Sequence, residues 1–129
     1  MASNLISVVD DDESVRRTTK RLIESFGYQA AVYESGEVLL RSRKLHETLC
    51  LIVDVQMPGI GGLELQRQLA AKGCSIPIIF ITAYRNETSR QQAMQAGAVA
   101  FLDKPFSDEQ LLKNIRSALK HRKKDTGTG

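Results

Sequence analysis

Residues 49–59, Leu-Cys-Leu-Ile-Val-Asp-Val-Gln-Met-Pro-Gly, decide how this chain folds. The first five are apolar, too few for a helix, and they predict a strand that is buried on both faces of a sheet. The strand ends in Asp54. Pro58 and Gly59 then turn the chain, because proline cannot continue a β-ladder and glycine tolerates turn dihedral angles. Asp54 is therefore predicted to be a carboxylate held rigidly at a strand end.

The composition is that of one globular domain. The chain has 129 residues, of which 42% are apolar and 26% charged, and such a length buries roughly two-thirds of the surface of the unfolded chain. No apolar run approaches the roughly 20 residues of a membrane span, and the N-terminus lacks the basic region of a signal peptide. We therefore expect a cytoplasmic protein in which Cys50 and Cys74 are reduced thiols.

Five short apolar segments alternate with segments of helical periodicity. The apolar segments are residues 5–9, 29–33, 49–53, 78–81 and 98–102. This alternation predicts an α/β fold, a doubly wound parallel sheet with helices on both faces. Residues 43–48 are polar and predict no particular structure. The helix predicted over residues 86–96 has few large apolar residues, so we expect it to pack weakly.

Short polar side chains mark where the helices should begin. Ser35 and Asn86 are predicted to cap helices, and Ser107 with Gln110 forms a capping box. The last helix is expected to end in the basic run 120–124, because cations suit a helix C-terminus. Residues 125–129, Asp-Thr-Gly-Thr-Gly, are then expected to form a disordered tail.

Polar groups follow four of the predicted strands. Right-handed crossovers place the carboxyl ends of parallel strands at one edge of the sheet, where ligands bind in doubly wound folds. The residues expected at this edge are Asp10, Asp11, Asp54, Thr82 and Lys104. Such a convergence of complementary groups predicts a functional site.

The residue types at this edge suit phosphoryl chemistry. Three carboxylates in one crevice repel one another, and a hard divalent ion such as Mg²⁺ relieves that repulsion through oxygen ligands. A carboxylate can itself attack a phosphoryl group and form an aspartyl phosphate. The ammonium of Lys104 and the hydroxyl of Thr82 can then stabilise the phosphoryl oxygens.

The sequence closely resembles the receiver domain of bacterial two-component response regulators over nearly the whole chain. The matching motifs are Val8-Val9-Asp10-Asp11 followed by Arg16-Arg17, Asp54 with Met57-Pro58-Gly59, Ile81-Thr82-Ala83, and Ala96-Gly97-Ala98 leading to Lys104-Pro105-Phe106. Residues 93–106 look most like regulators of the FixJ type, whose receivers precede a helix-turn-helix output domain. The resemblance implies a flavodoxin-like (βα)5 fold with strand order 2-1-3-4-5 over residues 1–124.

The resemblance also implies a role for each site residue. Asp54 would be the phosphoacceptor, with Thr82 and Lys104 contacting the phosphoryl group. Magnesium, with Mn²⁺ as a substitute, would be held by Asp11, Asp54 and the backbone carbonyl of Gln56, and by Asp10 through water. Thr82 and Phe101 would form the switch, although Phe101 is equally well explained as a core residue. A cis peptide bond is expected before Pro105.

The partners expected from the resemblance are those of a signalling switch. A sensor histidine kinase or a histidine phosphotransfer protein would phosphorylate Asp54, making the chain a self-phosphorylating phosphoacceptor rather than a turnover enzyme. The new charge would alter the face of the fourth helix, fifth strand and fifth helix, including Arg90, Gln95 and Lys113. That face would bind a partner or form a homodimer, and would control transcription through an output domain outside these residues. We expect no membrane contact and no direct binding of nucleic acid by this domain.

Two other interpretations fit part of the sequence. Val8-Val9-Asp10-Asp11-Asp12 matches the signature of haloacid-dehalogenase-like phosphohydrolases, in which Asp10 would be the nucleophile and Asp12 the acid. That function leaves Asp54 without a central role, and Asp12 is better explained as the cap of the first helix. A degenerate receiver that serves only as a binding module is the other alternative, and the complete set of polar groups disfavours it.

Overall fold

The structure, a computed structural model, describes residues 4–128. Its centre is one five-stranded parallel sheet in the order β2-β1-β3-β4-β5. The strands are β1 (Leu5–Val9), β2 (Gln29–Tyr33), β3 (Thr48–Asp54), β4 (Ile78–Thr82) and β5 (Ala100–Asp103). The helices are α1 (Glu13–Ser25), α2 (Gly36–Leu40), η1 (Arg43–Glu47), α3 (Gly62–Ala71), α4 (Glu87–Gln95) and α5 (Asp108–Thr128). The predicted flavodoxin-like fold and its strand order are confirmed.

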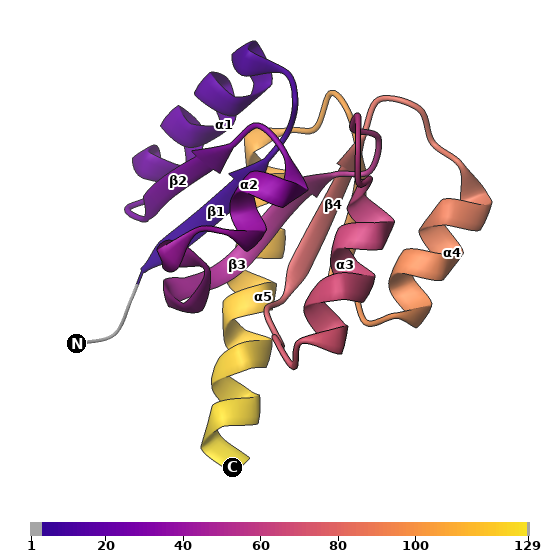
Figure 1. The fold of residues 1–129 in the computed structure, drawn as a ribbon. Helices are drawn as coiled ribbons and strands as arrows, with labels where there is room; N and C mark the ends of the chain where they lie inside the picture. The colour runs from indigo at the N-terminus through magenta and orange to yellow at the C-terminus, as the bar shows by residue number, and fades with distance from the viewer. Residues whose placement is uncertain (1–3, 129) are drawn as a thin grey trace.

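The helices form a layer on each face of the sheet (Figure 1). One face packs against α1 and α5, whose buried side chains include Ile23, Leu111 and Ile115. The other face packs against α2, α3 and α4, with Leu39 and Leu65 among the buried residues. The sheet is therefore covered on both sides, as the continuous apolar strands predicted.

Strand β3 is the middle strand of the sheet. Its residues Cys50, Leu51, Ile52 and Val53 are completely buried, and they alternate between the two faces of the sheet. Burying an aliphatic side chain of this size contributes roughly 1.5–3 kcal/mol. The packing of both layers on β3 therefore holds Asp54, the last residue of this strand, in a rigid position.

The predicted caps are present at the amino ends of the helices. Asp12 Oδ1 accepts hydrogen bonds from Ser14 N at 2.8 Å and Val15 N at 3.3 Å at the start of α1. Ser35 accepts from the backbone of α2 in the same way, and Asn86 from that of α4. In the capping box, Ser107 N donates to Gln110 Oε1 at 2.9 Å and Gln110 N donates to Ser107 Oγ at 3.0 Å. These caps start helices α1, α4 and α5 within a few residues of strand ends β1, β4 and β5.

The structure differs from the predicted boundaries in three places. The polar segment before β3 forms the 3₁₀ helix η1, which Ser42 caps and whose Leu45 is buried. Strand β5 begins at Ala100, two residues later than expected, because Ala98 N still donates to Ala93 O of the α4 end. Helix α5 continues to Thr128, so the backbone of residues 125–128 is helical where a disordered tail was expected. Gly129 lies outside the described residues.

Helix α4 is attached to the rest of the fold by few contacts. Among its residues, all of which the structure describes, only Ala93 is buried. A hydrogen bond from Gln66 Nε2 of α3 to Ala93 O, 3.1 Å long, adds a polar contact at this position. The prediction that this helix packs weakly is confirmed.

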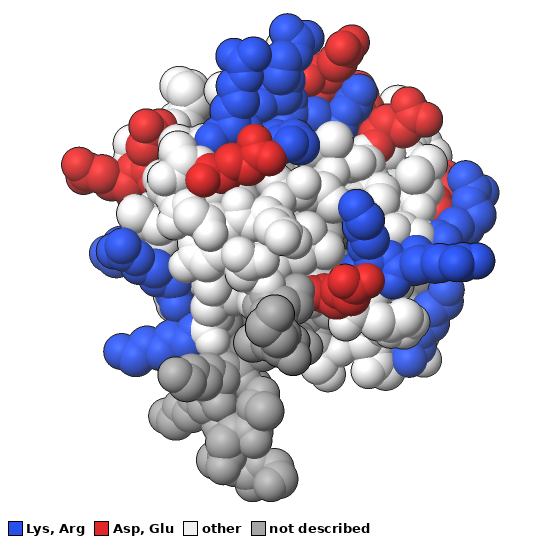
Figure 2. All heavy atoms as spheres, turned by 90° about the vertical axis from the view of Figure 1, so that its left-hand side faces the viewer, with Lys and Arg blue, Asp and Glu red and all other residues white. Residues whose placement is uncertain are grey.

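Charged side chains cover the outer side of α1. Figure 2 shows Lys and Arg interspersed with Asp and Glu at the top of the molecule, over the region of α1 in Figure 1. Two ion pairs one helical turn apart, Glu13 with Arg17 at 3.6 Å and Lys20 with Glu24 at 2.6 Å, lie on this exposed surface. Such pairs add a few tenths of a kcal/mol to a helix, roughly 0.2–0.5 kcal/mol each. Within residues 4–128, no helix combines the length and the apolar character that a membrane span requires.

Candidate functional site

The sheet brings the predicted site residues together at the carboxyl ends of its strands. Asp10 follows β1, Asp54 ends β3 and Thr82 ends β4. Lys104 follows β5, and its N–H donates to Thr82 O at 2.7 Å. Since these strands are neighbours in the order β1-β3-β4-β5, residues up to 94 positions apart in the chain reach one crevice.

Three carboxylates form an acidic cluster in this crevice. One oxygen from each of Asp10, Asp11 and Asp54 lies within 4.8 Å of the others. Asp10 is fully buried and Asp54 is 6% exposed, whereas Asp11 is open to solvent. Asp10 Oδ1 accepts a hydrogen bond from Asp12 N at 2.9 Å, and Asp54 Oδ1 accepts one from Gln56 N at 3.1 Å. Backbone N–H groups therefore fix one oxygen of each buried carboxylate.

Lys104 lies against the other oxygens of the two buried carboxylates. Its Nζ is 3.0 Å from Asp10 Oδ2 and 3.4 Å from Asp54 Oδ2. Burial opposes the charge of Lys104, but the hydrogen bond and the charge of Asp10, together with Asp54, raise the pKa of this ammonium. Lys104 is therefore a permanent cation at the site.

Burial raises the pKa of Asp54 above its ordinary value of 3.8. The hydrogen bond from Gln56 N opposes this shift, the charge of Asp10 adds to it, and the charge of Lys104 opposes it. With three carboxylates and one ammonium, the crevice keeps an excess of negative charge. A divalent cation would offset that excess and stabilise the ionised form of Asp54.

The donor atoms of the cluster fit a hard cation. Carboxylate oxygens are the ligands that Mg²⁺ prefers, and a site with one or two carboxylates leaves the remaining positions to water, backbone oxygen and substrate phosphate. The mixture of two buried carboxylates and one exposed carboxylate gives such a site with an opening to solvent. Asp10, Asp11 and Asp54 would hold the ion, and Gln56 follows Asp54 by two residues in the adjoining loop.

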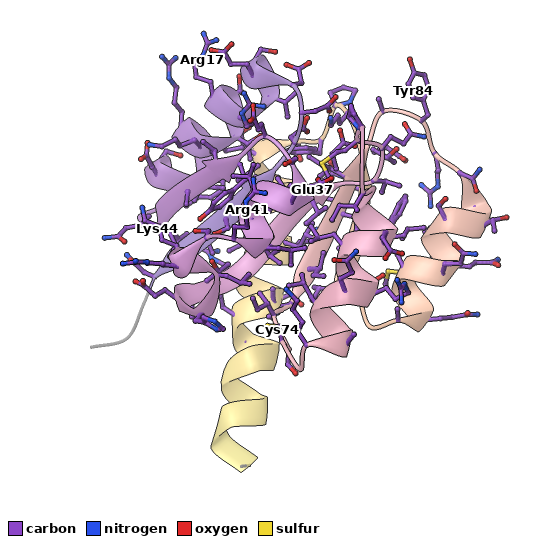
Figure 3. All side chains as sticks on the ribbon, in the orientation of Figure 1. Arg17, Glu37, Arg41, Lys44, Cys74 and Tyr84 are labelled. Atoms are coloured by element: carbon purple, nitrogen blue, oxygen red, sulfur yellow. The ribbon has the colours of Figure 1, made fainter. Side chains whose placement is uncertain are left out.

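Thr82 lies buried at the end of β4 with its hydroxyl engaged by the next loop. Thr82 Oγ1 donates to Tyr84 O at 3.0 Å and accepts from Tyr84 N at 3.1 Å. Tyr84 itself points into solvent, as Figure 3 shows, and is 74% exposed. The hydroxyl of Thr82 is thus coupled to the backbone that leads into α4.

Phe101 belongs to the core on the α3 side of the sheet. It is partly buried, and its ring centroid lies 6.1 Å from that of Phe80 with the planes tilted by 43°. The interpretation of Phe101 as a packed core residue is therefore confirmed. Its predicted role in a switch remains a prediction.

Two further predictions about this edge concern the backbone and Asp12. The bond between Lys104 and Pro105 is cis, as expected. Asp12 caps α1, and the hydrogen bond from the Ser14 hydroxyl is the largest of the effects that lower the pKa of Asp12. Asp12 Oδ1 accepts hydrogen bonds from Ser14 N, Ser14 Oγ and Val15 N, so the geometry is that of a helix cap and argues against the role that a phosphohydrolase would require of Asp12.

Sequence reasoning missed several contacts around the site. Arg16 of α1 reaches back to the end of β1, where its Nη1 donates to Asp10 O at 2.7 Å. Arg85 pairs with Asp103 at 2.8 Å and so joins the loop before α4 to the end of β5. Glu37 of α2 contacts the loop after Asp54 through Ile60 N. The Arg16-Arg17 motif was a signal for the first contact, whereas no sequence pattern indicated the other two.

The fold and the site define a parallel α/β domain with an acidic crevice at the end of its central strands. The sequence model of the response regulator receiver domain matches residues 6–116. The chain therefore belongs to the family of response regulator receiver domains. Phosphorylation by a kinase is general for this family, which disfavours the phosphohydrolase alternative.

Relatives of this chain include named response regulators. The response regulator protein TodT of Pseudomonas putida (strain ATCC 700007 / DSM 6899 / JCM 31910 / BCRC 17059 / LMG 24140 / F1) is 41% identical over 118 residues, covering 92% of this chain and 52% of TodT. The solved structure of the response regulator StyR has a TM-score of 0.88 at 38% identity, covering 98% of this chain and 66% of StyR. That of FixJ-N has a TM-score of 0.83 at 32% identity, covering 94% and 97%. The chain thus spans about half the length of TodT.

Proposed function

We propose that a sensor histidine kinase or a histidine phosphotransfer protein phosphorylates Asp54 in the presence of Mg²⁺, with Mn²⁺ as a substitute. The observation that carries this proposal is the position of Asp54, which ends the central strand, is nearly buried and lies between Gln56 N and the Lys104 ammonium. Asp10, Asp11, Asp54 and the backbone carbonyl of Gln56 would hold the ion.

The chain's own residues account for most steps of the transfer. An oxygen of Asp54 attacks phosphorus, the new P–O bond forms, and the bond between phosphorus and the donor imidazole nitrogen breaks. Lys104 neutralises charge on a phosphoryl oxygen, because its Nζ already lies beside the Oδ2 atoms of Asp10 and Asp54. When bound, Mg²⁺ supplies further positive charge for the phosphoryl oxygens.

The acquired phosphoryl charge provides the signal for the switch. Thr82 would give up its hydrogen bonds with Tyr84 and donate to a phosphoryl oxygen, which moves the loop that leads into α4. Phe101 would then fill the space that Thr82 leaves. Because α4 buries only Ala93 among its described residues, this helix can shift at a low cost in packing.

The output surface would be the face of α4, β5 and α5. Gln95 and Lys113 are exposed on it, and Arg90 is held by an ion pair with Glu87 at 2.6 Å. A shift of α4 would change the shape of this surface and favour the binding of a partner or of a second copy of the chain. The proposal extends to cytoplasmic signalling that controls transcription through an output domain outside these residues, while the domain itself binds no nucleic acid.

Mapping the phosphoryl group tests this function. The protein is incubated with Mg²⁺ and acetyl phosphate, the acyl phosphate is trapped with borohydride, and the modified peptide is located by mass spectrometry. We expect label on Asp54 that is lost in Asp54→Asn and in the presence of a chelator. Label on Asp10 would instead support a phosphohydrolase, and a protein that binds Mg²⁺ without taking label would be a binding module.

A further inference from the structure

The loop between β3 and α3, residues 55–61, is held by backbone hydrogen bonds where it leaves β3 and where it enters α3. Val55 N donates to Ile81 O at 2.9 Å, and Gly62 N donates to Val55 O at 2.9 Å. At the start of the loop, Gln56 N donates to Asp54 Oδ1. These bonds fix the stem of the loop but leave its outer turn, Pro58 to Ile60, to be held by other contacts.

Glu37 of α2 supplies a contact to this outer turn. Its Oε2 accepts a hydrogen bond from Ile60 N at 3.4 Å. Its Oε1 is buried and has no hydrogen-bond partner among the described residues. Figure 3 shows Glu37 on α2, beside the loop that precedes α3. A buried acceptor without a donor costs stability at this position.

Two glycines allow α2 and the loop to approach each other. Gly59 has φ +76°, and a Cβ at this position would lie 2.6 Å from Glu37 Oε2. On the helix side, a Cβ at Gly36 would lie 2.8 Å from Ile60 Cδ1. Both distances are shorter than any normal contact, so a side chain at Gly59 would displace the Glu37 carboxylate and one at Gly36 would displace the Ile60 side chain from their present positions.

We propose that Glu37 is a positioning residue for the divalent cation site. By holding Ile60 N, it fixes the outer turn of loop 55–61, and with it the orientation of the Gln56 backbone carbonyl toward the cation. The inference rests on the proposed function, because it assumes that the carbonyl of Gln56 is a ligand. Glu37 touches neither the cation nor the phosphoryl group and acts only through the loop.

The direct test is the affinity of the unphosphorylated protein for Mg²⁺, measured by isothermal titration calorimetry. Glu37→Ala should weaken binding on the order of tenfold, the lower end of the range for residues that orient metal ligands. Glu37→Gln keeps an acceptor for Ile60 N and should bind Mg²⁺ like the wild type. Glu34→Ala is the matched control, because it removes the same charge from an exposed residue just before α2.

A second measurement separates positioning from a general structural effect. In phosphorylation by acetyl phosphate, Glu37→Ala should be slow at limiting Mg²⁺ and recover the wild-type rate at saturating Mg²⁺. Circular dichroism reports whether each variant is folded. If Glu37→Ala does not fold, Glu37→Asp carries the test, because it keeps the charge but withdraws the carboxylate from Ile60 by one methylene and should also weaken Mg²⁺ binding.

Several outcomes would overturn the inference. Unchanged Mg²⁺ affinity in the folded Glu37→Ala or Glu37→Asp protein would remove its basis. If Glu34→Ala lost as much affinity for Mg²⁺ as Glu37→Ala, only the negative charge would matter. If Glu37→Gln lost as much affinity, the hydrogen bond to Ile60 N would not be the cause of the loss. If the wild type binds Mg²⁺ but takes no label on Asp54, the proposed function is wrong. If the wild type takes label on Asp54 but the Glu37 variants bind Mg²⁺ like the wild type, only the role of Glu37 is wrong.

Discussion

The ammonium of Lys104 lies 3.0 Å from Asp10 Oδ2, although 94 positions separate the two residues in the chain. The same Nζ is 3.4 Å from Asp54 Oδ2. In the absence of a metal ion, Lys104 is thus the internal counterion of both buried carboxylates. A bound cation and Lys104 therefore compete electrostatically for the same negative charge.

Removing this counterion should tighten metal binding. In Lys104→Ala, we expect the affinity for Mg²⁺ to rise on the order of tenfold, because even in bulk water a charge about 4 Å away contributes about 1 kcal/mol. Isothermal titration calorimetry measures the change. Lys113→Ala, which removes an exposed cation of α5, is the matched control and should leave the affinity unchanged. Equal affinities of Lys104→Ala and the wild type would contradict a counterion role.

Asp54 should make stability fall as pH rises in the absence of divalent cations. Because burial raises the folded-state pKa of Asp54 above the ordinary value of 3.8, the folded protein binds more protons than the unfolded chain in the interval above 3.8. This destabilising contribution is absent below pH 3.8 and complete once the pH exceeds the folded-state pKa. Asp54→Asn removes it.

The comparison of Asp54→Asn with the wild type measures this contribution. In urea denaturation with a chelator, the variant should have the larger free energy of unfolding at neutral pH, and the difference should shrink toward about pH 3. A difference that does not depend on pH would show that ionisation of Asp54 is not its source.

Thr82 should couple phosphorylation to α4 without being required for phosphorylation itself. Thr82→Ala removes the hydroxyl that bonds to Tyr84, at a cost to stability of about 1 kcal/mol. We expect Asp54 to accept label from acetyl phosphate in this variant, while NMR shifts of α4 amides on phosphorylation largely disappear. Thr82→Ser retains the hydroxyl and should retain the shifts. Wild-type shifts in Thr82→Ala would exclude this coupling.

Gly59 and Gly73 offer a matched pair for the contact between Glu37 and the loop. Both have φ +76°, but a Cβ at Gly73 would meet nothing within 4 Å, whereas at Gly59 it would meet Glu37. Gly73→Ala should cost about 1–2 kcal/mol for the left-handed backbone alone, and Gly59→Ala should cost more. Urea denaturation measures both variants. The additional loss of stability in Gly59→Ala should disappear when Glu37 is also changed to Ala. If it persists, contact with Glu37 is not its cause.

The two cysteines should differ in reactivity. Both are free thiols in the described part of the chain, but Cys50 is fully buried in β3, which raises its pKa to about 12, whereas Cys74 is partly exposed. Because the thiolate is the reactive form, iodoacetamide should modify Cys74 alone in the native protein and both residues in urea. Mass spectrometry of the peptides checks this, and native modification of Cys50 would reveal local opening of β3.

Much of the fold could be predicted because its signals are local. The apolar run of β3 and its ending at Asp54 follow from residue types within a few positions. The caps at Asp12, Ser35 and Asn86 likewise depend on hydrogen bonds within one turn of helix. The site could be located because parallel strands present their carboxyl ends at one edge, whatever the details of packing.

Other features depend on contacts between distant segments. The start of β5 is set by pairing with β4, in which Ile79 lies opposite Ala100, and not by the apolar run that begins earlier in the sequence. The fit of Glu37 to Gly59 and Ile60 brings together residues more than 20 positions apart. No local pattern specifies such a contact.

The sequence by itself determined the order of strands and helices along the chain, the helix caps and the identity of the acidic edge. These follow from the spacing of apolar residues, the turn residues and the right-handed crossovers of the chain. Only the tertiary structure decided which oxygen of Asp54 faces Lys104, how the hydroxyl of Thr82 is engaged and which residue supports the loop after β3. These are matters of a few tenths of a nanometre between separate elements, and the packing of both helical layers on the sheet sets such distances.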